Sequence, residues 1–231
     1  MDVCLKPSQL SGRIIAQPSK SDAHRRLICA AFAKGKSAIE NVVLSDDIRA
    51  TLQCVKAAGC NYKIQSSLRY SDRKRILISG TGGISNDNIS ADCGESGSTL
   101  RFMTMVLAAS GGKAVLDGGG RLPVRPMDGA IRLLEENDFD CTYPGNGKYL
   151  PLTIEGELHS GRNEIDSSIT SQYLSGLLMA LPAFSKSGEI LAIGQFESKG
   201  YVEVTKKIIK DYGIGIEGSN PYIIPENKGY V

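Results

Sequence analysis

Apolar residues recur along this chain with two spacings, which predict alternating helices and strands. From 21 to 34 they return at helical spacing, and Gly35 ends the segment. Short β-branched and apolar runs predict strands before and after this helix, at 13–16 and 37–43. A helix after Ser45 and strands at 61–64 and 75–79 complete this first group.

The same order of elements is expected twice more, with a period of roughly 75 residues. Each unit contains a strand, a helix, a strand, a helix and two strands. The further strands are expected at 89–93, 113–116, 141–143, 152–155, 163–166, 189–193, 214–216 and 222–224, and the further helices begin near 94–99, 126, 170–172 and 201.

This pattern predicts an α/β (α+β) fold of three βαβαββ repeats. The repeats span about 12–83, 84–158 and 159–231, and together they form one domain, 12–231. The helices after 94–99 and 170–172 are apolar on nearly all sides. A helix of this kind is buried, so we expect these two helices to form the centre of the domain.

Small hydroxyl residues open the first helix of each unit, and they favour an anion-binding site. Three-fold pseudo-symmetry would bring the three helix N-termini, with their free N–H groups, to one end of the domain. In the first helix Ser19 or Ser21 can act as N-cap, and Asp22 can pair with Arg26. The side chains of Lys20 and Arg25 are cations at an end where the helix dipole disfavours them. An anion between them explains this placement, and an exposed helix start with solvated charges is the alternative.

Two further arginines are candidates for the same site. Arg101 interrupts an apolar helix one turn from its start, so either a carboxylate pairs with it or it reaches the ligand. Arg125 lies in the loop 118–126, whose glycines would allow the backbone to approach a ligand. The nucleotide-binding patterns GxxxxGK and GxGxxG do not occur in the sequence.

Composition excludes several other classes of protein. The net charge of +2 is too small to argue for nucleic acid, and no apolar run is long enough to span a membrane. Six cysteines without a CxxC pattern and only two histidines predict reduced structural thiols rather than disulfides or a metal site. The N-terminal residues show no signal-peptide pattern, and we expect a cytoplasmic protein.

Six segments, in order along the whole chain, resemble the 5-enolpyruvylshikimate-3-phosphate synthases (3-phosphoshikimate 1-carboxyvinyltransferases). They are 18–25, 45–47, 94–101, 121–126, 171–174 and 198–201. The family chain is much longer and folds as two similar halves, each of three βαβαββ units, that react in the cleft between them. The resemblance implies that this sequence corresponds to the first half, with 1–11 an initial strand that belongs to the other half.

The resemblance also implies roles for individual residues. The residues that would hold shikimate 3-phosphate are Lys20, Ser21, Arg25, Thr170, Ser171, Gln172, Ser198 and Tyr201. Those that would hold phosphoenolpyruvate are Lys20, Gly97, Arg125 and Gln172, with Asp47, Glu95 and Arg101 supporting them. Glu95 stands where the family commonly has Asn. A carboxylate beside an anionic substrate is unfavourable unless it pairs with a cation such as Lys20 or turns away.

The implied reaction transfers the enolpyruvyl group from phosphoenolpyruvate to the 5-hydroxyl of shikimate 3-phosphate, in the shikimate pathway to chorismate and aromatic amino acids. It needs no metal or cofactor. In the family the proton-transfer groups lie in the second half, so we identify no catalytic residue here. We expect this chain to be an inactive, monomeric half whose partner is the C-terminal half, with no nucleic acid or membrane partner.

Two alternative functions are considered. The sister transferase that acts on UDP-N-acetylglucosamine has Asn after the first lysine and a cysteine in the 118–125 loop. This chain has Ser21 and no cysteine there, which argues against it. A non-catalytic phosphate-binding module would have the same converging residues, and turnover would distinguish the two readings.

Overall fold

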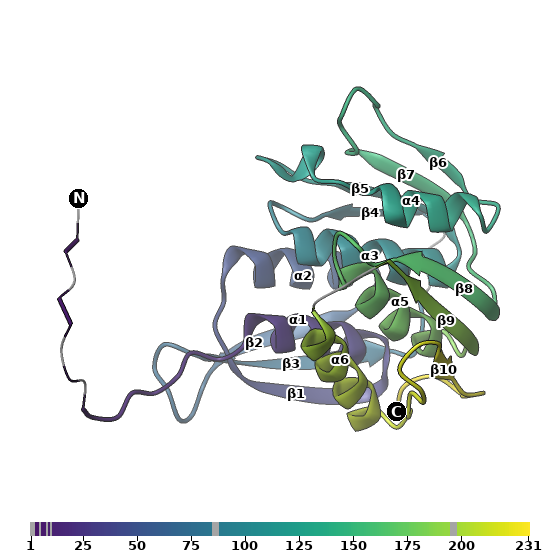
Figure 1. Cartoon of the computed structure of the whole chain (residues 1–231). Coiled ribbons are helices and arrows are strands. Elements are labelled where there is room, and N and C mark those ends of the chain that lie inside the picture. The colour runs from purple at the N-terminus through teal and green to yellow at the C-terminus, as the bar shows by residue number, and fades with distance from the viewer. Residues whose placement is uncertain (1–2, 5, 8, 10, 85–87, 195–197) are drawn as a thin grey trace.

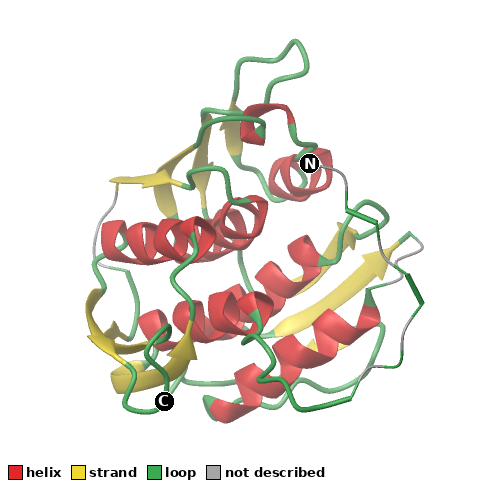
Figure 2. Cartoon of the chain, turned by 90° about the vertical axis from the view of Figure 1, so that its left-hand side faces the viewer, coloured by secondary structure: helices red, strands yellow, loops and turns green. Residues whose placement is uncertain are grey.

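The fold is described from a computed structural model that covers residues 3–4, 6–7, 9, 11–84, 88–194 and 198–231. Within these residues six α-helices and three small sheets follow one another along the chain (Figure 1). Figure 2 shows the strands in separate groups around the helices. The predicted mixed α/β class is therefore confirmed.

The first unit contains two helices and one three-stranded antiparallel sheet, whose strands lie in the order β1-β3-β2. The first helix packs on this sheet, and the second packs against β4 (Asn88–Asp92) of the next unit. Serines cap both helices of the first unit, because Ser19 Oγ accepts from Asp22 N at 3.2 Å and Ser45 Oγ from Ile48 N at 3.4 Å. Its elements are α1 (Lys20–Phe32), β1 (Lys34–Val42), α2 (Asp46–Ala57), β2 (Asn61–Ser66) and β3 (Lys74–Thr81).

The second unit has the predicted βαβαββ order in full. Its sheet has the order β4-β5-β7-β6, in which β4 and β5 are parallel and the other pairs are antiparallel. Its elements are β4 (Asn88–Asp92), α3 (Gly97–Ser110), β5 (Gly112–Asp117), a short 3-10 helix η1 (Leu122–Val124), α4 (Asp128–Glu135), β6 (Asp140–Thr142) and β7 (Leu152–Gly156).

The third unit repeats the parallel first pair but has fewer strands. Its sheet has the order β10-β9-β8, with β8 and β9 parallel and β9 and β10 antiparallel. Its elements are β8 (Gly161–Asp166), α5 (Gln172–Ala183), β9 (Gly188–Ile193), α6 (Lys199–Asp211) and β10 (Tyr222–Ile224).

Two predicted strands are wrong. Residues 13–16 are extended but belong to no sheet, and Ile14 and Ile15 are exposed. Residues 214–216 form no strand either, and a single bridge joins Glu217 to Ile223 instead. A strand requires a neighbour to receive its backbone hydrogen bonds, and the apolar pattern alone does not supply one.

The described residues before α1 lead away from the rest of the chain, as Figure 1 shows. Of the predicted initial strand 1–11, the structure describes 3–4, 6–7, 9 and 11, and none of these is in a strand. Residues 1, 2, 5, 8 and 10 lie outside the described residues. The assignment of this segment to another half stays a prediction.

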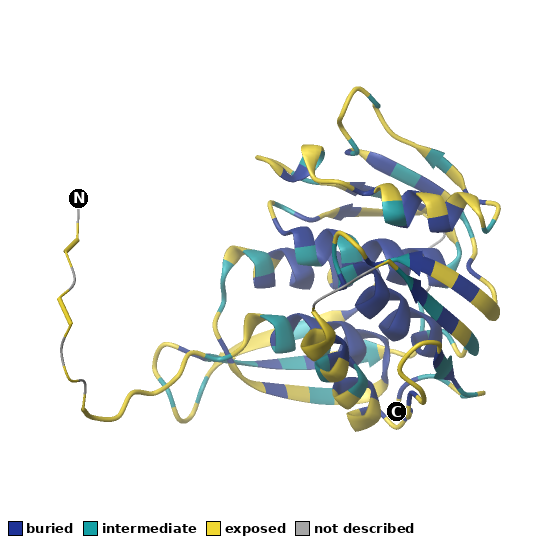
Figure 3. Ribbon diagram, in the orientation of Figure 1, coloured by how far each residue is buried: buried dark blue, intermediate teal, exposed yellow. Residues whose placement is uncertain are grey.

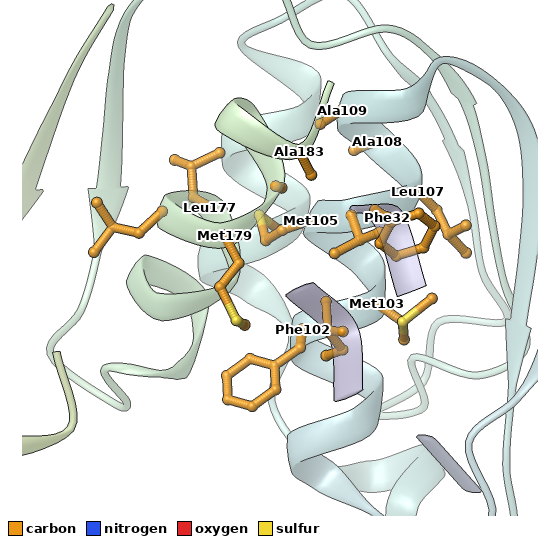
Figure 4. Packing of buried hydrophobic residues seen from close by; sticks show 14 of the residues in the cluster. Phe32, Phe102, Met103, Met105, Leu107, Ala108, Ala109, Leu177, Met179 and Ala183 are labelled. Atoms are coloured by element: carbon orange, nitrogen blue, oxygen red, sulfur yellow. The ribbon is translucent and has the colours of Figure 1, made fainter. Parts of the chain in front are cut away.

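The centre of the domain is the pair α3 and α5, which pack on each other more extensively than any other two helices. Figure 3 shows both helices almost wholly buried, and Figure 4 shows their side chains interleaved, among them Met105, Leu177 and Met179. Gly176 allows this approach, since a Cβ there would lie 3.0 Å from Met105 Cγ and 3.2 Å from Arg101 O. The apolar patterns therefore identified the central helices correctly.

Candidate functional site

A polar pocket of about 220 Å³ lies where helices from the first and third units begin. Its lining residues are Ser21, Arg25, Thr170, Ser171, Gln172, Ser198 and Tyr201. They come from the starts of α1, α5 and α6 and the turns before them. The pocket thus unites seven of the eight residues predicted to bind shikimate 3-phosphate, all except Lys20.

Arg25 is the cation at the base of this pocket and is only 2% exposed. Its Nε donates to Thr205 Oγ1 at 2.6 Å, its Nη1 to Ser21 O at 2.8 Å and its Nη2 to Ser175 Oγ at 3.2 Å. Thr205 in turn donates to Tyr201 O at 2.8 Å. These bonds use three of the five N–H donors of the guanidinium, so two remain for a ligand.

The positive charge of Arg25 is desolvated without a carboxylate in contact. Burial lowers the pKa of Arg25 to about 10, and the side chain remains charged at neutral pH. The guanidinium lies 4.8 Å from the ring centroid of Phe102 and 5.8 Å from that of Tyr201. Within the described residues no carboxylate lies within 4.0 Å of it. A buried cation of this kind favours an anionic ligand.

The serines that begin α5 and α6 differ from the capping serines of the first unit. Neither Ser171 nor Ser198 accepts a capping bond from its own helix, although each occupies the N-cap position. Both line the pocket. Their hydroxyls therefore face the pocket at the positive ends of two helix dipoles, whereas the N–H groups of Gln172 and Tyr201 already donate to Thr170 Oγ1 and Ser198 O.

A hydrogen-bonded network extends from this pocket toward α3. Arg101 Nη1 donates to Gln172 Oε1 at 2.7 Å, and Gln172 Nε2 donates to Ser98 Oγ at 2.7 Å. The orientation of the Gln172 amide follows from these two partners. In the described part of the chain no carboxylate pairs with Arg101 within 4.0 Å, so the first of the two predicted alternatives does not apply. Arg101 instead contacts Gln172, which lines the pocket.

Arg125 reaches the N-terminus of α3 because residue 97 is a glycine. A Cβ at Gly97 would lie 2.5 Å from Arg125 Nη1 and 3.5 Å from Arg101 Nη1. Two guanidinium groups and a helix N-terminus therefore meet at one point. Lys20 begins α1 and forms an ion pair with Asp47 at the start of α2, and the backbone carbonyl of Asp47 accepts a hydrogen bond from Thr99 Oγ1 in the first turn of α3. Arg101, Arg125 and the start of α3 are therefore a second candidate for anion binding, which Arg101 links to the first pocket through Gln172.

The sequence pattern of one protein family, EPSP synthase (3-phosphoshikimate 1-carboxyvinyltransferase), matches residues 5–230. The chain belongs to this family. Its curated relatives include the 3-phosphoshikimate 1-carboxyvinyltransferases of Clostridium perfringens (strain SM101), 35% identical over 231 residues, and of Clostridioides difficile (strain 630), 35% identical over 229 residues. The alignments cover 99% and 97% of this chain but 52% of each relative. The chain thus spans about half the length of the curated relatives it matches.

Solved structures of EPSP synthases share the fold. The EPSP synthase of Acinetobacter baumannii superposes with a TM-score of 0.76 at 20% identity, over 95% of this chain and 48% of that one. The enolpyruvyl transferase NikO of Streptomyces tendae is more distant, with a TM-score of 0.57 and 14% identity over 93% of this chain. The three-unit arrangement therefore corresponds to one half of the enolpyruvyl transferase fold.

Glu95, the residue that departs from the EPSP synthase pattern, does not pair with Lys20. Its exposed carboxylate lies against the backbone of Gly120, where a Cβ would overlap it, and Gly120 has the left-handed φ of 57°. Lys20 pairs with Asp47 instead. Of the two arrangements expected for Glu95, pairing with Lys20 is therefore not seen, and its orientation relative to a bound substrate stays a prediction.

Sequence reasoning missed the residues behind the two anion sites. Thr205 and Ser175 hold Arg25, and Tyr173 touches Arg101. Ser175 carried a signal, because it is a hydroxyl in a helix that is otherwise almost wholly apolar. Thr205 lies one turn after Tyr201 on α6 and carries no comparable signal.

A buried polar chain connects the starts of the first three helices in this EPSP synthase domain. His24 Nδ1 lies 2.7 Å from Thr51 Oγ1, which lies 2.7 Å from Thr99 Oγ1, and Thr99 Oγ1 donates to Ser96 Oγ at 2.8 Å. Burial lowers the pKa of His24 to about 4, against the raising effect of Asp47, so the ring is neutral at neutral pH. The chain fixes α1, α2 and α3 relative to one another.

Other surfaces offer less to an anionic substrate. A larger hollow, about 540 Å³, lies on the β1-β3-β2 sheet between side chains such as Lys36, Lys63 and Leu77, and no helix begins there. Among the described residues, no group of three or more His, Cys, Asp or Glu side chains is placed to hold a metal ion. No described helix has both the length and the apolar character needed to cross a bilayer.

Proposed function

We propose that this chain binds shikimate 3-phosphate and phosphoenolpyruvate as one half of a 3-phosphoshikimate 1-carboxyvinyltransferase. In the reaction the 5-hydroxyl of shikimate 3-phosphate attacks C2 of phosphoenolpyruvate while C3 takes a proton. Phosphate then leaves C2 of the tetrahedral intermediate while the C3 methyl group gives up a proton, which restores the double bond of the enolpyruvyl ether. Family membership, which makes the protein a transferase homologue, supports this reaction.

The observation that carries the proposal is the pocket around Arg25. It combines an unpaired buried cation, two N-cap serines that do not cap and a glutamine amide held by Arg101. A phosphate dianion can accept bonds from the guanidinium and from both serine hydroxyls, and the glutamine amide can bond to a ring hydroxyl. Shikimate 3-phosphate therefore fits with its phosphate between Arg25, Ser171 and Ser198, and its ring toward Gln172 and Tyr201.

Phosphoenolpyruvate fits the second anion site. Arg125 can bind its carboxylate or phosphate with two parallel N–H groups, and Lys20 supplies a point charge nearby. Asp47 holds the ammonium of Lys20 and Arg101 holds Gln172. We assign the proton-transfer groups to the second half of the enzyme, because the residues that we assign to phosphoenolpyruvate are mainly cations and the carboxylate of Asp47 is paired with Lys20.

Binding of shikimate 3-phosphate tests this proposal without any need for turnover. Chemical-shift titration of the chain should give saturable shifts at the starts of α1, α5 and α6. Ser171→Ala and Ser198→Ala should each weaken binding about tenfold or more, since a hydrogen bond to a charged group contributes about 1.5–3 kcal/mol. Arg25→Gln should abolish detectable binding.

The variants Ser171→Ala and Ser198→Ala should lower the affinity for shikimate 3-phosphate without lowering the stability of the fold. Neither hydroxyl caps its helix, so both variants should unfold at nearly the wild-type urea concentration. Ser160→Ala is the control, because Ser160 Oγ accepts from Ser187 N at 3.1 Å on an exposed surface outside the pocket. Unchanged affinity in both pocket variants would refute the assignment of the phosphate to this pocket.

A further inference from the structure

A buried tyrosine hydroxyl lies between the two anion sites. Tyr173 follows Gln172 in the first turn of α5 and is 1% exposed. Its O–H donates to Pro126 O at 2.7 Å and accepts from Arg101 Nε at 3.4 Å. The edge of its ring packs over Gly129, where a Cβ would lie 3.5 Å from Cδ2 and Cε2. One side chain thus joins α5, α3 and the start of α4.

Tyr173 fixes the guanidinium of Arg101 from two directions. The guanidinium carbon lies 5.5 Å from the centroid of the Tyr173 ring, and its Nε is bonded to the hydroxyl. On the opposite edge of the same guanidinium, Arg101 Nη1 donates to Gln172 Oε1 at 2.7 Å. Because a guanidinium is planar and rigid, fixing its Nε edge also fixes the direction of the bond to Gln172.

The same hydroxyl also fixes the loop that carries Arg125. Pro126 directly follows Arg125, and its carbonyl receives the Tyr173 O–H and, at 3.5 Å, Arg101 Nη2. On the other side of Arg125, its own N–H donates to Leu122 O at 3.0 Å. The backbone of Arg125 is therefore held on both sides, and the hold on its C-terminal side depends on Tyr173.

We propose that Tyr173 is a positioning residue that sets the geometry of Arg101, Gln172 and Arg125 for phosphoenolpyruvate. This inference rests on the proposed function. The tyrosine does not line the Arg25 pocket, and its buried hydroxyl reaches the substrate only through these three side chains. Burial raises the pKa of Tyr173, so the hydroxyl remains a neutral donor across the physiological range.

The variant Tyr173→Phe removes only the hydroxyl and keeps the ring. It should weaken phosphoenolpyruvate binding about tenfold, measured by chemical-shift titration in the presence of saturating shikimate 3-phosphate. Binding of inorganic phosphate at Arg25, whose bonds to Ser175 and Thr205 do not involve Tyr173, should change less than about twofold. A general loss of stability would weaken the binding of phosphoenolpyruvate and of inorganic phosphate alike. A difference between the two affinities therefore indicates positioning.

Tyr230→Phe is a matched control. Tyr230 is also 1% exposed and its hydroxyl donates to a backbone carbonyl, Met179 O, at 2.7 Å. Loss of the Tyr230 hydroxyl should lower the free energy of unfolding about as much as loss of the Tyr173 hydroxyl. It should leave the affinities for phosphoenolpyruvate and inorganic phosphate unchanged. A signal from the free protein gives a second readout: the Arg101 Nε–H should exchange with water faster in Tyr173→Phe than in wild type or Tyr230→Phe.

The possible results are distinct. A wild-type chain that binds neither shikimate 3-phosphate nor phosphoenolpyruvate would overturn the proposed function and this inference with it. A wild-type chain that binds both, together with a Tyr173→Phe variant of equal phosphoenolpyruvate affinity, would overturn the inference alone. Equal weakening of both probes would reduce Tyr173 to a structural role, which also contradicts the proposal.

Discussion

His24 is an uncharged imidazole enclosed beside two cations. It is 1% exposed, Lys20 and Arg25 lower its affinity for a proton, and Asp47 opposes them. Among the described residues its Nε2 has no hydrogen-bond partner. Protonation would therefore place a charge where neither water nor a carboxylate solvates it.

We predict that this histidine makes the fold acid-sensitive. The pKa of His24 is about 4 in the folded state and 6.5 in a free side chain, so below pH 6.5 the unfolded chain binds the proton more readily. The stabilisation is complete above pH 6.5 and is lost as the pH falls toward 4, by about 3 kcal/mol in total. Urea unfolding between pH 4.5 and 7.5 measures this loss.

The variant His24→Gln separates the contribution of His24 to the pH dependence of stability from the contribution of the carboxylates. The stability of the variant should fall less steeply below pH 6.5 than that of the wild type. His159→Gln replaces the other histidine, which is exposed, and serves as the control. Parallel stability curves for wild type and His24→Gln would show that His24 is not the group responsible.

Local chemistry made part of the site predictable from the sequence. Hydroxyl residues and cations at helix starts indicated Ser21, Arg25 and Ser171, because every helix N-terminus has free N–H groups and the positive end of a dipole. Ser198 was expected only from the family resemblance. The partners of Arg25 were not predictable, because Ser175 lies 150 residues away and nothing local marks its direction. Lys20 was expected to contact both substrates. Its ion pair with Asp47 could not be predicted, because that contact depends on how α1 and α2 pack.

At the scale of elements, the apolar patterns predicted which helices are central but not which strands pair. Residues 13–16 have the composition of a strand, yet they lie outside any sheet. The second unit contains the complete order because β6 pairs with β7, whereas in the third unit 214–216 find no such partner and only the Glu217–Ile223 bridge forms. Pairing is a tertiary property, so composition sets only the propensity for it.

The contact between α3 and α5 gives a prediction at this scale. Gly176→Val should destabilise the protein by about 2–3 kcal/mol, because the added atoms would overlap Met105 and the backbone of Arg101. Gly200→Val is the control, since a Cβ at Gly200 on α6 meets nothing within 4 Å, and it should change stability by less than about 0.5 kcal/mol. Urea denaturation of both variants provides the comparison. Equal stability of the two would mean that the helices can separate at little cost.

At the scale of the whole molecule, the chain matches about half the length of its curated relatives. We propose that 12–231 folds as one domain and that residues from a second half complete the reaction site. The two anion sites can orient substrates, but orientation accelerates a reaction only when both reactants are held in near-attack geometry and proton transfer is provided.

We therefore predict that this chain alone releases no phosphate at a sustained rate from shikimate 3-phosphate and phosphoenolpyruvate. Addition of the complementary half as a separate chain should restore release, because the connection between the halves needs only to keep them near each other. A colorimetric phosphate assay with each chain alone and with both chains tests this. Sustained release by this chain alone would show that the acid and base lie within it.

The bonds of Arg25 also determine when the phosphate pocket can exist during folding. Its partners Ser175 and Thr205 are 150 and 180 positions further along the chain, and closing loops of that length is slow compared with forming a helix. The first unit can collapse on its own sheet long before the third has docked. The capacity to bind phosphate therefore arises at the end of folding, when the most distant segments of the sequence have met, and its recovery after dilution from urea marks the completion of the native topology.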